Sequence, residues 1–303
     1  MSAAVWPPIS HDALIQEEEA SLARELEWLL NSLQESLASF KSGLEDCIAL
    51  LAPQEPGATL VLSSHRSESV KGFVTRVGTR IIKGDIHLRL PTLPGPRNPH
   101  PPPPNHPPPP PQLTTTRALI NQALDIIDVS TWTGDAHSAP FISGQLRLLH
   151  ENITEARQTL RGGEESLGNG WPSPPPPPLL SFHLSIHDAA LVLHLRTLSP
   201  TPPADSTFSR LLGLAAAPPS HDETGRTFVY GGQEVRVREK VRVESQDPSL
   251  MAVMAKLSAV GHGVGFRAVV VPDLFMRLNM AVLRWPRFTQ KVKQTDRRVY
   301  ANQ

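Results

Sequence analysis

Leucines and other apolar residues recur at helical spacing along the first fifty residues. Their positions follow one another at gaps of 4, 3, 4, 4, 3, 4, 3 and 4, a heptad pattern with one stutter. The pattern predicts one helix over about 12–51, roughly 60 Å long. A leucine contributes about 1.5–3 kcal/mol when fully buried, so an aligned stripe indicates that other helices cover it. This leucine seam comprises Leu22, Leu26, Leu29, Leu33, Leu37, Phe40, Leu44, Cys47 and Leu51.

Alternating apolar and polar residues predict β-strands in the middle of the chain. In one such run, Ile86, Leu88 and Leu90 point one way and the polar residues between them point the other. A turn near Asp188 separates two later runs of the same period. The predicted strands cover 58–63, 70–77, 80–90, 180–186, 191–195, 228–230 and 235–243, with Gly78–Thr79 and Gly231–Gly232 as tight turns.

Helical spacing returns in three further segments. Apolar stripes predict helices from about Leu113 to Ile127 and from Phe141 to Leu160. Pro248 suits a first helical position and begins a third helix, over about 248–257. Beyond Val260 we expect the helix to break, because glycine and proline disfavour helix interiors. The residues concerned are Gly261, Gly263, Gly265, Pro272 and Pro286.

Two proline tracts separate these segments. Thirteen of the 21 residues in 91–111 are proline, as are six of the seven in 172–178. Such tracts favour extended polyproline II and cannot join a helix interior or a sheet ladder. The segment 199–225, rich in proline and alanine, is predicted to be a disordered insertion. With helices at both ends and strands between them, the chain is predicted to belong to the α+β class.

Charge is balanced overall and uneven locally. The chain has 29 basic and 29 acidic residues, so no global field draws it to nucleic acid or anionic lipid. Residues 12–51 carry a net charge of −7, and residues 249–303 carry +7. These blocks could pair within one helical bundle or form two independently solvated faces. An Arg-rich stretch from Arg284 to Arg298 could touch lipid or RNA, but a solvated tail is favoured because its aromatics lack stacking periodicity.

Cysteine usage and hydropathy indicate an intracellular protein. Cys47 is the only cysteine, so no disulfide framework forms. The first ten residues lack the basic and apolar regions of a signal peptide, and no run of about 18 apolar residues suggests a membrane span. We expect a cytoplasmic protein without membrane insertion.

No motif points firmly to catalysis, a cofactor or a metal. His183 and His187 lie four apart with His194 nearby, but the period of two places the first two on the polar face of a strand, which we interpret as solvated. The Gly261–Gly265 segment resembles a phosphate loop only superficially, because it neither follows a strand nor continues into Gly-Lys-Ser/Thr. The chain has no nucleophile elbow, and Cys47 is a core candidate. We expect no enzymatic activity.

The proline tracts leave a second function open. Preformed polyproline II is what SH3, WW and profilin-type grooves bind, so the chain could be a cytoskeletal or signalling adaptor. The alternative is a spacer, which is favoured because only Arg97 places a basic residue near the proline runs of the longer tract.

In the order of its elements, the chain resembles the Rogdi family, whose fungal members are the second subunit of the RAVE complex, a regulator of the vacuolar and endosomal proton ATPase. Four segments carry the resemblance, with the 247–257 helix fitting as well. They are the Glu17–Leu30 entry to the first helix, Val70–Phe73 leading to Asp85–Pro91, the Ala118–Ile127 helix, and Phe228–Gln233 running into Val235 and Val237. None is a catalytic motif, so specificity lies in their order.

The resemblance implies an antiparallel bundle that unites N- and C-terminal helices, with a separate, mainly antiparallel β domain. The bundle would contain 12–52, 113–161 and 248–290, and the β domain 57–90 and 179–245, with 91–111, 172–178 and 199–225 as proline-rich linkers or insertions. It implies a scaffold that acts with the large propeller-bearing RAVE subunit on the peripheral sector of the ATPase, recruited from the cytoplasm to vacuolar and endosomal membranes. It transfers no binding residues, and after about Val260 the chain departs from the family pattern.

Overall fold

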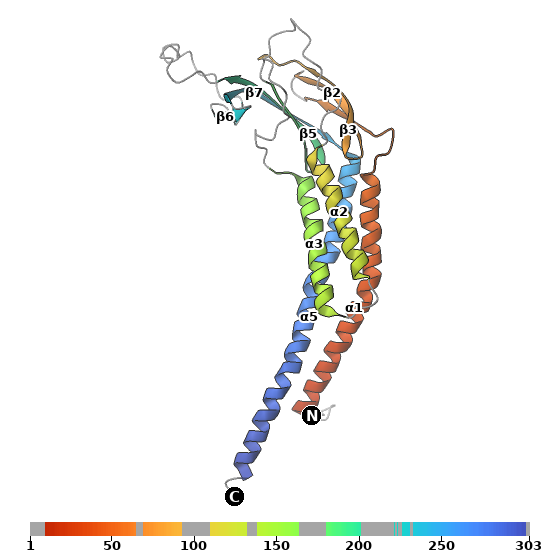
Figure 1. Ribbon diagram of the computed structural model, residues 1–303, viewed down its shortest axis with the longest axis vertical. Coiled ribbons are helices and arrows are strands. Elements are labelled where there is room, and N and C mark those ends of the chain that lie inside the picture. The colour runs from red at the N-terminus through yellow and green to blue at the C-terminus, as the bar shows by residue number, and fades with distance from the viewer. Residues whose placement is uncertain are drawn as a thin grey trace, which may run out of the picture. The chain divides into compact units, whose positions relative to one another are not determined.

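The computed structural model describes residues 10–64, 69–92, 110–131, 138–163, 180–200, 221, 223, 226–230 and 233–300. The proline tracts and the predicted 199–225 insertion lie almost entirely outside these residues. Figure 1 shows the described helices and strands. They confirm the predicted α+β class, with four helices and two antiparallel sheets in the described part of the chain.

The helices match the apolar stripes of the sequence. The four helices are α1 (His11–Leu50), α2 (Pro111–Ser130), α3 (Ala139–Arg161) and α5 (Pro248–Tyr300). Ser10 precedes α1, and its hydroxyl accepts a hydrogen bond from the Ala13 amide at 3.2 Å, as an N-cap residue does. Leu51 was predicted inside the first helix but lies in the turn just after it, where its amide donates to the Cys47 carbonyl at 3.1 Å.

The strands form two sheets. The first, β1-β2-β3, contains β1 (Ala58–Ser63), β2 (Val70–Val77) and β3 (Arg80–Leu88); the second, β4-β5-β7-β6, contains β4 (Leu180–His187), β5 (Ala190–Pro200), β6 (Thr227–Tyr230) and β7 (Gln233–Gln246). Every pair is antiparallel, and β1 also contacts β7. Two-residue turns join β2 to β3 and β4 to β5, as predicted. Asp188 and Ala189 have positive φ, which suits the hairpin turn between β4 and β5.

The chain divides into two compact units. The helical unit comprises residues 1–45, 120–154 and 257–303, and the sheet unit comprises 46–119 and 155–256. Each of the four helices contributes residues to both units. In the helical unit, α1 and α5 run antiparallel, because partner numbers on α5 fall as those on α1 rise. Three contacts show this order: Ser36 meets Arg267, Phe40 meets Gly263, and Gly43 meets Val260.

The expected break after Val260 is wrong, because α5 continues to Tyr300. The glycines there serve close packing between helices. A Cβ on Gly263 would lie 2.8 Å from Phe40 Cε1, and one on Gly265 would lie 2.9 Å from His150 Cε1. The missing side chains therefore let α1 and α3 approach α5, which offsets the intrinsic cost of glycine in a helix, about 1 kcal/mol per residue.

The interpretation of the β4 polar face as solvated is also wrong. Ser181 is 1% exposed and Ser185 is 8% exposed, whereas His183 and His187 are half-buried. Within the sheet unit, Ser181 pairs in register with Arg196, whose guanidinium is buried against Glu223. The strand is therefore largely covered on both faces, which its period of two did not reveal.

One helical stretch, Pro248–Arg277, is long and apolar enough to cross a membrane by length and composition alone. This corrects the expectation that no segment meets such a criterion. A third of its most apolar window, 33%, is buried inside the protein, and core helices of soluble proteins pass the same test.

Candidate functional site

The leucine seam lies on the buried face of α1. Within the helical unit, Leu33, Leu37 and Leu44 are fully buried, and the three leucines nearer the N-terminus are less than a tenth exposed. Phe40 is half-buried. In the sheet unit, both Cys47 and Leu51 are fully buried. The predicted seam residues Leu22, Leu26, Leu29, Leu33, Leu37, Phe40, Leu44 and Leu51 thus all turn away from solvent, although Phe40 does so only partly.

Buried stripes on the other three helices face inward within the helical unit. The stripes recur at gaps of three and four, the spacing by which one helix buries a single face, apart from one gap of seven in α5. In α5, the stripe includes two valines close to the seam of α1, because Val260 approaches Gly43 and Val264 lies one turn further on. The buried members are Ile120, Ala123 and Ile127 of α2, Ile142, Leu146, Leu149 and Ile153 of α3, and Leu257, Val260, Val264, Val271 and Leu274 of α5.

A single arginine interrupts the buried stripe of α5. The Arg267 guanidinium lies over the Phe40 ring, 5.4 Å from the ring centroid. Its Nη2 donates to the Ser36 hydroxyl at 2.6 Å, and its Nη1 donates to the Gly263 carbonyl at 3.3 Å. A polar residue that finds partners in only one alignment fixes the register of paired helices. Sequence reasoning missed this contact, although Arg267 occupies the heptad position between Val264 and Val271.

Ion pairs flank the apolar seam in each unit. In the helical unit, Lys41 Nζ of α1 lies 2.6 Å from Asp128 Oδ1 of α2. In the sheet unit, Lys256 Nζ of α5 lies 2.8 Å from Asp46 Oδ2 of α1. A hydrogen bond to the neighbouring carboxylate raises the pKa of each lysine. Because water and salt screen exposed pairs, these contacts affect the orientation of the helices more than the stability of the fold.

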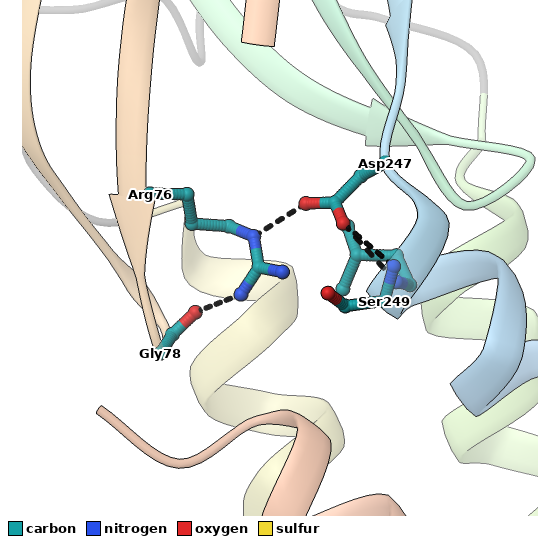
Figure 2. A network of polar contacts seen from close by, with 5 residues as sticks. Arg76, Gly78, Asp247 and Ser249 are labelled. Atoms are coloured by element: carbon teal, nitrogen blue, oxygen red, sulfur yellow. Dashed lines mark hydrogen bonds and ion pairs between the residues drawn. The ribbon is translucent and has the colours of Figure 1, made fainter. Parts of the chain in front are cut away.

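The start of α5 is tied to the first sheet by a buried ion pair (Figure 2). Arg76 Nε of β2 lies 2.6 Å from Asp247 Oδ2, and the two side chains are 3% and 0% exposed. The other oxygen, Asp247 Oδ1, accepts from the amides of Ser249 at 3.0 Å and Leu250 at 3.3 Å. Asp247 is therefore the N-cap of α5 as well as the partner of a buried cation. Arg76 also donates to the Gly78 carbonyl in the β2–β3 turn.

A second buried ionic cluster lies on the β4-β5-β7-β6 sheet. Arg196 donates from Nε and Nη2 to the two carboxylate oxygens of Glu223, at 2.9 and 3.1 Å. Lys240 Nζ lies 2.7 Å from Glu223 Oε1. Burial alone raises the pKa of Glu223, but the hydrogen bonds from Arg196 and Lys240 outweigh it and hold the pKa below its ordinary value. The sequence did not indicate this cluster.

The residues weighed for catalysis or metal binding do not come together as a site. Burial raises the pKa of the Cys47 thiol to about 11, so the reactive thiolate is scarce at neutral pH. His183 lies directly opposite His194 across β4 and β5. No group of three potential metal ligands occurs within the described part of the chain. The Gly261–Gly265 segment, which resembles a phosphate loop only superficially, is part of the helix α5.

The described geometry is a set of long helices with one buried face each, and the starts of α1 and α5 are capped by Ser10 and Asp247. A search of curated proteins found no match to this chain. A sequence profile of the family described as Rogdi leucine zipper containing protein matches residues 25–266, which cover most of the chain, including most of the leucine seam, both sheets and the first third of α5. The chain belongs to the Rogdi leucine zipper family.

Proposed function

We propose that the chain is a non-enzymatic scaffold subunit of the RAVE complex that promotes assembly of the vacuolar and endosomal proton-transporting ATPase. Its partners would be the large propeller-bearing RAVE subunit and the peripheral sector of the ATPase. It would reside in the cytoplasm and reach vacuolar and endosomal membranes through these partners, without binding nucleic acid or inserting into lipid.

Family membership is the observation that carries this proposal. The match spans residues 25–266, so it covers helices and sheets together and not one repeated pattern. The buried seam adds physical support, because a helix whose apolar face is already covered has its outer face available for partners. Burial keeps the Cys47 thiol protonated, so this residue acts as part of the core and not as an activated nucleophile.

The test is affinity purification of the full-length tagged chain from cells, with the large RAVE subunit and peripheral ATPase subunits detected by immunoblotting. Leu37→Asp places a charge at a fully buried seam position, whereas Ser39→Asp places the same charge on the exposed face of α1. We expect the wild type and Ser39→Asp to recover both partners, and Leu37→Asp to lose them together with helical content. Recovery of neither partner by the wild type, in glucose-fed or glucose-starved cells, would refute the proposal.

A further inference from the structure

The helix α5 carries a second, outward-facing stripe within the helical unit. Its members follow one another at gaps of 3, 4, 3 and 4. At about 100° per residue, this set lies on the side of α5 opposite the buried stripe of Val260, Val264, Val271 and Leu274. The apolar members are unusually exposed for their size, with exposed fractions from 59% to 71%. The outer stripe consists of Phe266, Val269, Asp273, Met276 and Met280.

Heptad spacing is the pattern that a second helix requires for knobs-into-holes packing. A single exposed apolar residue needs no explanation, but four on one seam indicate an interaction surface. Methionine and phenylalanine are also enriched at protein interfaces, and methionine adapts its shape to different partners. The outer stripe is therefore suited to an amphipathic helix.

Asp273 determines which kind of partner helix fits the outer stripe. It is the central member of the outer stripe, and no ion pair of its carboxylate is found among the side chains that the structure describes. Covering the stripe would bury this carboxylate, and a buried charge without a partner is strongly unfavourable. Arg277, one turn further along α5, compensates this charge only in part, so a helix that covers the stripe is favoured when it places a lysine or arginine opposite Asp273.

Asp273 also disfavours a second copy of this chain as the partner that covers the outer stripe. Because Asp273 is central, aligning two copies of the outer stripe, parallel or antiparallel, brings one Asp273 against the other. Like charges at such a position disfavour pairing. A lipid surface is disfavoured as well, because it would draw a carboxylate into the acyl boundary. A bilayer span would require an apolar circumference, whereas the opposite face of α5 packs within the unit.

We propose that the outer stripe of α5 binds an amphipathic helix of another protein, with apolar residues at heptad spacing and a basic residue opposite Asp273. The stripe lies at and beyond residue 266, where the family match ends. This binding surface is thus a property of this chain and does not depend on the proposed role in ATPase assembly.

The test uses the full-length chain and two synthetic helices of about 28 residues, four heptads each. Both probes carry leucine and isoleucine at the seam positions, and they differ only in having lysine or glutamate opposite Asp273. Affinities are measured by fluorescence anisotropy. We expect the lysine probe to bind at least about tenfold more tightly than the glutamate probe, because opposite charges are favoured and like charges repelled at such a contact. Asp273→Lys should reverse the preference.

Two further variants distinguish binding at the outer stripe from non-specific hydrophobic binding. Val269→Lys charges the outer stripe and should abolish binding of both probes. Val61→Lys makes the same change at an equally exposed valine of β1, 64% exposed against 71%, and should leave binding unchanged. Equal affinity for the two probes, or binding that survives Val269→Lys, would overturn the proposal.

Two other results would also overturn it. One is a dimer in sedimentation velocity that Val269→Lys dissociates, since a second copy would then occupy the stripe. The other is uptake by vesicles of phosphatidylcholine and phosphatidylserine that Val269→Lys prevents. Co-purification with the RAVE subunit is scored separately, because it tests the proposed function and not this surface.

Discussion

At the scale of single residues, the strongest polar contacts join segments that are far apart in the sequence. Asp247 is the clearest case, because one carboxylate oxygen binds Arg76 of β2 and the other caps α5. Arg76 is separated from it by 171 positions. Loss of either contact would leave a buried group without its partner. Asp247 therefore fixes both where α5 begins and how α5 meets the sheet.

Substitutions at Asp247 separate the two functions. Asp247→Ala should lower the free energy of unfolding by about 3–5 kcal/mol, because Arg76 stays buried without its counterion. Asp247→Asn retains a good N-cap acceptor and should be milder by about 1 kcal/mol. Adding Arg76→Met to Asp247→Asn should restore part of the loss. Urea titration followed by circular dichroism measures all three, and an Asp247→Asn protein as stable as the wild type would contradict the importance of the pair.

The lowered pKa of Glu223 predicts how the stability of the sheet unit changes in acid. Its pKa is lower in the folded chain than in the unfolded chain, because the cations Arg196 and Lys240 stabilise the carboxylate. The unfolded chain therefore takes up the proton first as the pH falls. The contribution of Glu223 is fully present above its unfolded pKa and is lost as the pH decreases through the folded pKa.

We therefore expect thermal stability measured from pH 7 to pH 3 to fall more steeply for the wild type than for Glu223→Gln. The variant should be less stable than the wild type at neutral pH and should approach it in acid. Glu234→Gln on β7 is a suitable control, since that residue is exposed. Parallel stability curves for the wild type and Glu223→Gln would show that the cluster does not respond to pH.

At the scale of secondary-structure elements, glycine acts differently at two kinds of helical position. Gly263 of α5 faces the Phe40 ring, and the Arg267 guanidinium packs over that ring. An added methyl group at Gly263 therefore has no space. Gly144 of α3 has no atom within 4 Å of where its Cβ would be. The same substitution should therefore have opposite effects at the two sites.

Gly144→Ala should raise the free energy of unfolding by up to about 1 kcal/mol, the difference in helix propensity. Gly263→Ala should lower it by about 1–3 kcal/mol despite the same gain, because overpacking displaces Phe40. Thermal melts followed at 222 nm give both values. If both variants were more stable than the wild type, the close contact between α1 and α5 at Phe40 and Gly263 would be contradicted.

These glycines also show what the sequence could and could not predict. The bounds of β1 and β2 coincide with the predicted ones, because a period of two and the neighbouring turns are local properties. The burial of the leucine seam follows from a local repeat as well. The continuation of α5, the covered face of β4, and the contacts of Arg76, Arg267 and Glu223 depend on residues that meet only in the folded chain, so no local pattern indicates them.

At the scale of the whole molecule, the first and last helices of the chain depend on each other. The helix α1 begins at His11 and α5 begins at Pro248, yet they share the register fixed by Ser36 and Arg267. The long connection between them costs little more entropy than a shorter one, because closure cost grows only logarithmically with length. A chain that ended before α5 would leave the seam of α1 partly uncovered, so loss of this helix should affect folding and partner binding together.

The longer proline tract provides the last test, because it distinguishes a spacer from a binding motif. Its flanks are anchored in the sheet unit. The Thr92 hydroxyl lies 2.7 Å from that of Thr197 and donates to Glu239 Oε2 at 2.8 Å, and Pro110 accepts from the Leu113 amide at 3.1 Å. Replacing residues 94–108 with a Gly-Ser sequence of equal length spares these contacts and removes the polyproline II preference.

If the tract is a spacer, the Gly-Ser chain should melt within a few degrees of the wild type, because a flexible linker changes only a small entropic term. It should also recover the large RAVE subunit and the peripheral ATPase subunits as efficiently in affinity purification. A chain that folds normally but loses its partners would show instead that they bind polyproline II, which favours a cytoskeletal or signalling adaptor. Both measurements are needed, because a chain that melts normally but loses its partners is expected only if the tract is a binding motif.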